Sequence, residues 1–179
     1  LITSAPFLST NPTLPFLFSL AGRQPEFRGM GTTLVAALIQ GDCATVINVG
    51  DSRAYRFDGE AMHQISEDHS YVEEMRRRGK ITEADARTHP QKNLITRAVG
   101  VEPYVEGDLF EVRLTEKDML LLCSDGLTGM AEDSWIAEVL ANAPTLELAG
   151  DALLQLALDG GGRDNITVAL FTLGKKQGA

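Results

Sequence analysis

The chain has 179 residues, of which 44% are hydrophobic, and is long enough for one domain with a substantial core. Its 25 acidic residues outnumber its 16 lysine and arginine residues, which gives a formal net charge of −9. Because no basic patch stands out, neither nucleic acid nor an anionic membrane surface is expected as a partner. Clustered aspartates suit divalent cations, although most acidic residues in such a chain serve only solubility.

The first 28 residues form an atypical N-terminal segment that is rich in Pro, Ser and Thr and shows no clear period, so extended or irregular packing is expected. Residues 14–20 are apolar, but no basic residue precedes them, prolines interrupt the region, and the run is too short to span a bilayer. We therefore expect a cytoplasmic protein without a transmembrane helix. The chain begins with Leu rather than Met, which indicates a fragment or a processed form.

A run of small apolar residues follows at 34–39, with Thr32 and Thr33 before it and Gly41 after it. Ala and Leu favour helices, Thr caps helix starts and Gly caps helix ends. This run therefore predicts a buried helix.

Three strands are predicted next. Residues 43–49 are strand-like, and a turn at 50–51 makes residues 52–57 the expected partner strand. The Asp-Gly pair at 58–59 is a hairpin signal, after which residues 61–65 form a short strand. Together these segments predict an antiparallel meander.

The character of the chain changes at residues 66–93, which are polar and have little to bury. Short helices are predicted at 71–79 and 82–88, the first ended by Gly79 and the second by the His-Pro pair that follows it. We interpret this stretch as a mobile flap over a sheet edge. Its charge run is interpreted as a solvated face rather than a binding site.

Strands and helices both occur in the C-terminal half. The predicted elements are a strand at 105–114, a central strand at 119–123, helices at 132–141 and 146–158, and a last strand at 166–173. Residues 175–179 are interpreted as a frayed tail. The order of elements predicts the α+β class, and because several strands are apolar on more than one side, helices are expected on both faces of a layered sandwich.

Cys43 and Cys123 both lie in apolar surroundings without metal-type spacing. We interpret them as small core residues in a reducing compartment rather than as a disulfide. Neither begins a CxxxxxR phosphate-binding loop, because the sixth residue after each is Val49 and Gly129. A cysteine nucleophile is therefore not expected.

Three aspartates lie at turns beside apolar strand-like runs: Asp125 after the central strand, Asp164 before the last strand, and Asp51 in the first turn. A strand end fixes the position of such a side chain, and a neighbouring glycine lets the backbone turn sharply. Carboxylate oxygens are the ligands that Mg²⁺ and Mn²⁺ prefer, and a pair of these ions activates water toward phosphorus. Singly, each Asp also suits an ordinary turn or cap. Together they predict three carboxylates, each at a turn beside a strand, that converge on a metal site.

Six pieces of sequence occur in an order typical of one enzyme family. They are MGTTLVAALI at 30–39, VGDSRAYRF at 49–57, EDHSYVEEM at 67–75, HPQKNLITRAVG at 89–100, LLCSDGLTGM at 121–130 and GGRDNITVAL at 161–170. On these motifs the chain resembles the PP2C-type (PPM) metal-dependent protein serine/threonine phosphatases. The DHS and ITRA pieces are similar to the bacterial branch of that family.

The resemblance implies a four-layer α-β-β-α sandwich over residues 29–174, with a two-metal centre between two central sheets and residues 66–93 as a flap that influences substrate choice. It implies that Asp125 and Asp164 are ligands of a core Mn²⁺ or Mg²⁺ pair, and that Asp51 belongs to a third, weaker metal position. The expected reaction is direct attack of a metal-bound hydroxide on phosphoserine or phosphothreonine of a protein substrate, or on an aryl phosphate, without a covalent phosphoenzyme.

The family's N-terminal motifs are missing. Residues 1–29 contain no RxxNED-type cluster and no DGMGGH-type motif, and their only acid is Glu26. The family's phosphate-binding arginine has no counterpart, and Gly129 stands where many relatives have a third-metal Asp. We therefore expect an N-terminally truncated sandwich with an under-liganded metal centre, and an exposed sheet edge that invites pairing into a homo-oligomer.

Two functional interpretations remain open. In the first, the chain is a shortened phosphatase that keeps hydrolysis dependent on Mn²⁺ or Mg²⁺, because the SDG and RDN motifs are intact. In the second, it is a catalytically impaired PP2C-like module that binds phosphoproteins or acts as a regulatory or structural fragment. Metal-dependent hydrolysis of an aryl phosphate separates the two.

Overall fold

The structure is a computed structural model that describes residues 13–174. Within these residues the chain divides into two compact units. The first comprises 13–35, 47–52 and 67–109, and the second comprises 36–46, 53–66 and 110–174. Residues 1–12 and the predicted tail at 175–179 lie outside the described residues, and the predicted domain boundary between residues 28 and 29 stays a prediction.

The second unit is built on a four-stranded antiparallel sheet with the order β4-β3-β6-β7. Its strands are β3 (Arg53–Phe57), β4 (Met62–Gln64), β6 (Met119–Cys123) and β7 (Val168–Thr172). The predicted central strand is confirmed, because β6 lies between β3 and β7 and is apolar on both sides. Leu121 packs into one core cluster, and Leu120 packs into another.

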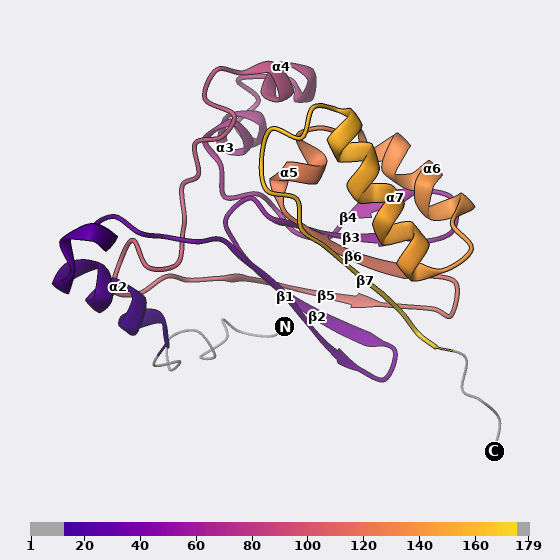
Figure 1. Ribbon diagram of the computed structural model, residues 1–179, viewed down its shortest axis with the longest axis horizontal. Helices are drawn as coiled ribbons and strands as arrows, with labels where there is room; N and C mark the ends of the chain where they lie inside the picture. The colour runs from indigo at the N-terminus through magenta and orange to yellow at the C-terminus, as the bar shows by residue number, and fades with distance from the viewer. Residues whose placement is uncertain (1–12, 175–179) are drawn as a thin grey trace. The chain divides into compact units, whose positions relative to one another are not determined.

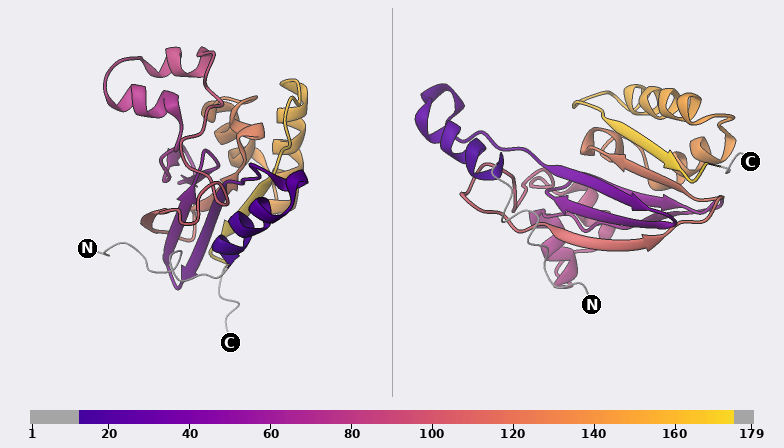
Figure 2. Two further views of the ribbon diagram at one scale, coloured as in Figure 1. Left: turned by 90° about the vertical axis from the view of Figure 1, so that its left-hand side faces the viewer. Right: turned by 90° about the horizontal axis from the view of Figure 1, so that it is seen from below.

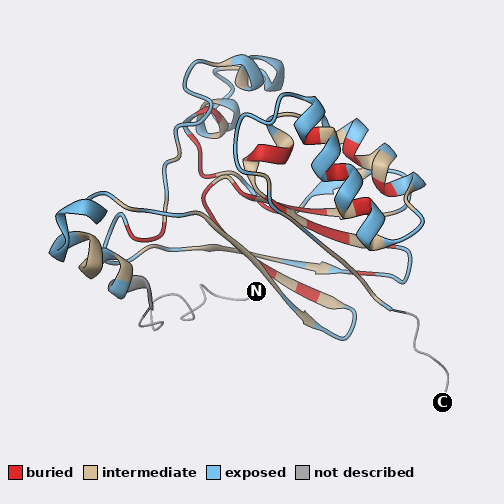
Figure 3. Ribbon diagram, viewed as in Figure 1, coloured by how far each residue is buried: buried red, intermediate tan, exposed pale blue. Residues whose placement is uncertain are grey.

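Helices cover one face of this sheet (Figure 1 and Figure 2). They are α5 (Asp125–Thr128), α6 (Asp133–Asn142) and α7 (Leu146–Asp159). Ile136 of α6 and Leu153 of α7 are fully buried in one cluster with Tyr55 and Leu121 of the sheet. Figure 3 shows buried stretches alternating with exposed ones along both helices. The two helices predicted after the central strand are thus confirmed as α6 and α7.

The opposite face of the sheet packs on parts of three further strands. They are β1 (Leu34–Gln40), β2 (Cys43–Val49) and β5 (Asp108–Arg113), paired in the order β1-β2-β5. Leu120 and Phe171 share a core cluster with Ile39, Ala44 and Leu114, all within the second unit. A helix layer, a sheet and strands of another sheet therefore follow one another in this unit, which confirms the α+β class.

The predicted buried helix at 34–39 is wrong, because these residues lie in β1. Ala37 and Ile39 pack against the core, whereas Leu38 between them is 60% exposed. This alternation has the period of two that a strand shows. Gly41, with a φ of 64°, then turns the chain back into β2. Strand pairing with β2 therefore outweighs the helix propensity of Ala and Leu.

The expected pairing of β2 with β3 is also wrong, because the two strands lie in different sheets. Both backbone groups of Gly50 are bonded elsewhere: its N–H donates to Nδ1 of His69 at 3.1 Å, and its carbonyl accepts from the N–H of His69 at 2.9 Å. Gly50 has a φ of 108°, in the region that favours glycine. The chain therefore leaves one sheet at Gly50 and enters the other at Arg53.

The first unit contains three helices and one short 3-10 helix. They are α2 (Thr13–Arg23), η1 (Pro25–Phe27), α3 (Tyr71–Arg77) and α4 (Glu83–Thr88). α2 overturns the expected irregular packing of residues 13–23. Pro15 falls in its first turn, where a missing N–H is tolerated, and Leu17 packs against the buried Val49 and Val99. Because this contact joins residues far apart in the sequence, no periodic pattern of apolar residues within 13–23 predicts the helix.

The helices α3 and α4 confirm the two helices predicted within residues 66–93. Ser70 caps α3 by accepting from the N–H of Glu73, and Thr82 forms a capping box with Asp85 at the start of α4. The arginines of both helices pair with nearby glutamates at the protein surface. The charge run is thus a solvated face, as predicted, whereas the mobility of a flap stays a prediction.

Cys43 and Cys123 are both free thiols. Cys123 is buried in the core and Cys43 only partly buried, so the core interpretation holds best for Cys123. The reducing compartment stays a prediction. Among residues 13–174, no helix has the length and apolar character needed to cross a bilayer.

Candidate metal centre

Asp125 lies at the end of the central strand, as the sequence predicts. β6 ends at Cys123, Ser124 has an extended backbone, and Asp125 begins the short helix α5. The side chain of Asp125 is half-buried. Because β6 is hydrogen-bonded on both sides, the sheet fixes the place where this carboxylate emerges.

Ser124 fastens the end of β6 to the segment that enters β7. Its Oγ donates a hydrogen bond to the carbonyl of Asn165 and accepts one from the N–H of Thr167, both at 3.0 Å. The N–H of Ser124 also donates to the carbonyl of Thr167 at 3.1 Å. These three bonds, which we call the serine lock, bring Asp164 to the same end of the sheet as Asp125.

Gly126 lets the two segments approach each other closely. A Cβ atom at this position would lie 2.3 Å from the carbonyl oxygen of Asn165. Gly126 is not among the glycines with positive φ, so the expected sharp turn does not explain it. The glycine of the SDG motif is required for contact between segments and not for a left-handed backbone.

The electrostatics of Asp125 indicate a site for a cation. Burial raises the pKa of its carboxyl, and the negative charge of Asp164 raises it further. The N–H groups of Gly126 and of Asp125 itself, and the charge of Arg53, lower it in part, but the pKa stays above its ordinary value. A divalent cation stabilises two carboxylates that disfavour each other's charge. The structure thus brings together two of the three predicted carboxylates.

Asp164 is exposed and also has the ordinary role of a turn residue. Its Oδ1 accepts a hydrogen bond from the N–H of Asn165 at 2.7 Å. This bond leaves the second carboxylate oxygen and further lone pairs available as donors to a cation. The turn interpretation and the ligand interpretation are therefore compatible.

Sequence reasoning missed Arg53, which lies opposite Cys123 in the ladder between β3 and β6. Its Nη1 donates to the hydroxyl of Tyr55 at 3.0 Å, and that hydroxyl donates to Oδ1 of Asp133 at 3.4 Å. Burial raises the pKa of Tyr55 far above its ordinary range, so the hydroxyl stays neutral. The signal in the sequence is the spacing of two, because it puts Arg53 and Tyr55 on one face of a strand.

Asp51 belongs to the first unit and follows the end of β2. It is half-buried, and the residue before it, Gly50, is bonded through its backbone to His69. Asp125 and Asp164 belong to the second unit. The convergence of all three carboxylates therefore stays a prediction.

Within residues 13–174, no group of three or more His, Cys, Asp and Glu side chains is arranged to hold a metal ion. The pair of Asp125 and Asp164 still fits Mg²⁺ or Mn²⁺ chemically, because these ions are commonly bound by one or two carboxylates and several waters. The raised pKa of Asp125 shows that positive charge is favoured beside it. The described residues thus place two carboxylates at one end of the sheet, with chemistry that suits these ions.

The family model described as Protein phosphatase 2C matches residues 18–159 of the chain. The serine/threonine phosphatase Stp of Listeria innocua is 46% identical over 150 residues, which cover 84% of this chain and 60% of the relative. The chain thus spans about 60% of the length of the curated relatives it matches.

Solved structures show the same similarity. The serine/threonine phosphatase Stp1 of Staphylococcus aureus matches with a TM-score of 0.87 and 43% identity, over 90% of this chain and 63% of that chain. The catalytic domain of the phosphatase PstP, solved in complex with 2 manganese ions, matches with a TM-score of 0.78 and 36% identity, over 88% of this chain and 64% of that chain.

Proposed function

The chain belongs to the protein phosphatase 2C family, and we propose that it carries part of the catalytic centre of a metal-dependent protein serine/threonine phosphatase. The proposed substrates are phosphoserine and phosphothreonine in proteins, and aryl phosphates. The proposed cofactor is Mn²⁺ or Mg²⁺. The relatives named serine/threonine phosphatase, and the manganese complex of PstP, support both proposals.

One observation carries the proposal: the serine lock holds a half-buried carboxylate beside a second one. The pKa of Asp125 is raised by its burial and by the charge of Asp164. A stretch of chain selected only for stability would favour an uncharged residue at such a place, because two adjacent carboxylates repel. Groups with perturbed pKa values cluster at functional sites, and the neighbouring SDG and RDN motifs match that expectation.

The residues have distinct roles in the proposal. Asp125 and Asp164 would hold the divalent cation, and Asp51 would add a carboxylate at a further position. The bound cation supplies positive charge that polarises a phosphate and acidifies water. Arg53, held by Tyr55, offsets part of the negative charge at Asp125. Arg53 thus eases the repulsion that a divalent cation would remove further.

We also propose a cytoplasmic location and a phosphorylated protein as partner. The four-stranded sheet of the second unit has β4 and β7 at its edges, each paired on one side within the described residues. Such edges support the proposal of a homo-oligomer, because unpaired strand groups add a further strand readily. Light scattering tests this point: a monomer at all concentrations contradicts it.

The experiment compares p-nitrophenyl phosphate hydrolysis with Mn²⁺ and with EDTA, in the unsubstituted chain and in two variants. Asp125→Asn should lower the Mn²⁺-dependent rate by roughly a hundredfold or more, because even groups that only orient a ligand cost ten- to hundredfold. Asp151→Asn, an exposed aspartate on α7, is the control and should keep the rate.

Mn²⁺ binding is measured in parallel by calorimetry. Binding without any metal-dependent hydrolysis would favour the catalytically impaired module that binds phosphoproteins. Equal Mn²⁺ affinity in Asp125→Asn and the unsubstituted chain would show that the metal site has been placed wrongly.

A further inference from the structure

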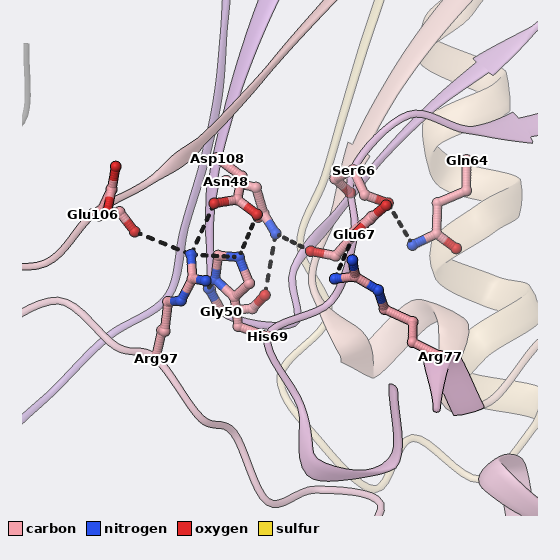
Figure 4. A network of polar contacts seen from close by, with 10 residues as sticks. All are labelled: Asn48, Gly50, Gln64, Ser66, Glu67, His69, Arg77, Arg97, Glu106 and Asp108. Atoms are coloured by element: carbon pink, nitrogen blue, oxygen red, sulfur yellow. Dashed lines mark hydrogen bonds and ion pairs between the residues drawn. The ribbon is translucent and has the colours of Figure 1, made fainter. Parts of the chain in front are cut away.

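A polar cluster surrounds Gly50 in the first unit (Figure 4). Gly50 donates its N–H to Nδ1 of His69 at 3.1 Å, and its carbonyl accepts from the N–H of His69 at 2.9 Å and from Nδ2 of Asn48 at 3.1 Å. Asn48 is fully buried and His69 is 6% exposed. The backbone of Gly50 is therefore held by two buried residues, through two side-chain bonds and one backbone bond, and not by a neighbouring strand.

The hydrogen bonds of His69 define its tautomer. Nδ1 accepts the N–H of Gly50, so it carries no proton, and the proton of a neutral imidazole then lies on Nε2. Nε2 in turn lies 3.2 Å from Oδ2 of Asp108 and donates to it. Doubly protonated His69 would set two donors, Nδ1–H and the N–H of Gly50, against each other.

The carboxylate of Asp108 accepts hydrogen bonds from two residues. Nη1 of Arg97 donates to Oδ1 of Asp108 at 2.8 Å, and Nε2 of His69 donates to Oδ2. Arginine has no acceptor, so the 3.2 Å approach of Arg97 to Nε2 of His69 is a contact between two donors that share one carboxylate. Burial raises the pKa of Asp108, but the hydrogen bonds from Arg97 and His69 outweigh it, and the pKa lies below its ordinary value.

The held glycine directly precedes Asp51. Gly50 has a φ of 108°, and a Cβ atom on it would lie 2.3 Å from Cγ2 of Thr33. Thr33 is itself hydrogen-bonded to Ser52, on the other side of Asp51, at 2.8 Å. The residues on both sides of Asp51 are thus hydrogen-bonded within the first unit, Gly50 through its backbone and Ser52 through its side chain, and two of these bonds go to His69.

We propose that His69 is a positioning residue for Asp51. In its Nε2–H tautomer, held by Asp108, the His69 side chain accepts the N–H of Gly50 at Nδ1, while the backbone N–H of His69 holds the Gly50 carbonyl. Together these bonds fix the direction in which the Asp51 carboxylate points beyond the end of β2. The proposal deepens the proposed function, because it takes Asp51 as a metal ligand. Loss of a group that orients a metal ligand from outside the coordination shell commonly lowers metal affinity about ten- to hundredfold.

The first test is the tautomer of His69 in the metal-free chain, read by long-range ¹H–¹⁵N NMR correlations. We expect a protonated Nε2 and an unprotonated Nδ1, together with slow hydrogen exchange of the Gly50 amide. A proton on Nδ1 overturns the proposal. His63 is an internal reference, because its Nε2 contacts Asp58 at 2.7 Å on an exposed hairpin. This test needs no variant and no activity.

The second test is Mn²⁺ titration by calorimetry. His69→Leu should weaken the Asp51-dependent binding step roughly tenfold, the lower end of the range for orienting groups. His69→Gln should keep part of that affinity, because an amide supplies an acceptor and a donor. His63→Leu, which removes a surface histidine paired to an aspartate, should change nothing. His69→Gln keeps the test valid if His69→Leu does not fold.

The outcomes are distinguishable from failure of the phosphatase proposal, which is decided by Asp125→Asn. If Asp51→Asn weakens Mn²⁺ binding and a folded His69 variant does not, His69 has only a structural role and the proposal is overturned. If Asp51→Asn binds Mn²⁺ like the unsubstituted chain, Asp51 is not a ligand and the positioning role is overturned with it. Weaker binding in both Asp51→Asn and His69→Leu supports the proposal.

Discussion

The two units hold their carboxylates in opposite ways. In the second unit, Asp125 is half-buried beside Asp164, and its pKa is raised. In the first unit, Asp108 receives hydrogen bonds from Arg97 and His69 that outweigh burial, and its pKa is lowered. The first arrangement lowers the stability of the ionised protein and the second raises it. The difference indicates that the chain tolerates electrostatic cost where we propose that a cation binds, and pairs the Asp108 carboxylate of its other polar cluster with two donors.

Gly126→Ala should disrupt the second unit most strongly. The new Cβ would lie 2.3 Å from the carbonyl oxygen of Asn165, so the backbone of the serine lock has to move. We expect the free energy of unfolding to fall by about 2–3 kcal/mol, as for other overpacked sites, measured by urea denaturation.

The matched control is Gly150→Ala in α7, where a Cβ meets nothing within 4 Å. There the free energy of unfolding should rise by about 0.5–1 kcal/mol, because alanine is the better helix former. If Gly126→Ala were as stable as Gly150→Ala, the close approach between the SDG and RDN segments would not exist.

Tyr55→Phe should have an intermediate effect. It removes the hydroxyl that accepts from Arg53, at a cost of about 1 kcal/mol in the free energy of unfolding for a lost buried hydrogen bond. Because Arg53 is then held less firmly, the pKa of Asp125 should rise further in an NMR titration of the metal-free chain. Tyr104→Phe, at a tyrosine that is 69% exposed, is the control and should change neither quantity. An unchanged pKa of Asp125 in Tyr55→Phe would remove Arg53 from the site.

The smallest expected effects concern how stability depends on pH, and they test the contrast between the two units directly. A carboxyl whose folded pKa is raised costs stability as the pH rises from its ordinary pKa of about 3.9 through the folded value, and this cost persists above it. Metal-free Asp125→Asn should therefore melt at a higher temperature than the unsubstituted chain at neutral pH, with the difference disappearing in acid.

Asp108→Asn should show the reverse sign. A carboxyl whose folded pKa is lowered contributes stability that is present above about pH 3.9 and lost as the pH falls through the folded value. Asp108→Asn should therefore melt at a lower temperature at neutral pH, by a small amount because the side chain is 36% exposed. Thermal melts across the acid range measure both variants, and shifts of the same sign would refute the contrast between the units.

The sequence predicts the second unit well because its signals are local. The apolar run of β6 packs into a core cluster on each face, and a turn motif directly follows it, so Asp125 could be placed from neighbouring residues alone. α6 and α7 carry apolar residues at helical spacing and lie where expected. Asp164 was found in the same way, from a glycine-rich approach to a final strand.

The failures share one physical cause, which is that long-range hydrogen bonds decide the outcome. Residues 34–39 have helix propensity, but pairing with β2 makes them a strand. Gly50 looks like part of a hairpin turn, but its backbone N–H and carbonyl are hydrogen-bonded to His69, 19 positions later. The spacing of Arg53 and Tyr55 puts them on one face of a strand but reveals no role, because Asp133, which accepts from Tyr55, is 78 positions away. Contacts of this kind cannot be read from a window of neighbouring residues.

The serine lock also sets an order of events during synthesis. Ser124 and Asn165 are 41 positions apart, so the ribosome releases Asp125 well before the residues that fasten it. Loop closure over such a distance comes late compared with the local turns of α6 and α7. A nascent chain that stops before Asn165 therefore has the carboxylate of Asp125 without the bonds that Ser124 makes to Asn165 and Thr167. The proposed capacity to bind a cation at this place would arise only once β7 has joined β6, so metal uptake would report that this pairing has formed.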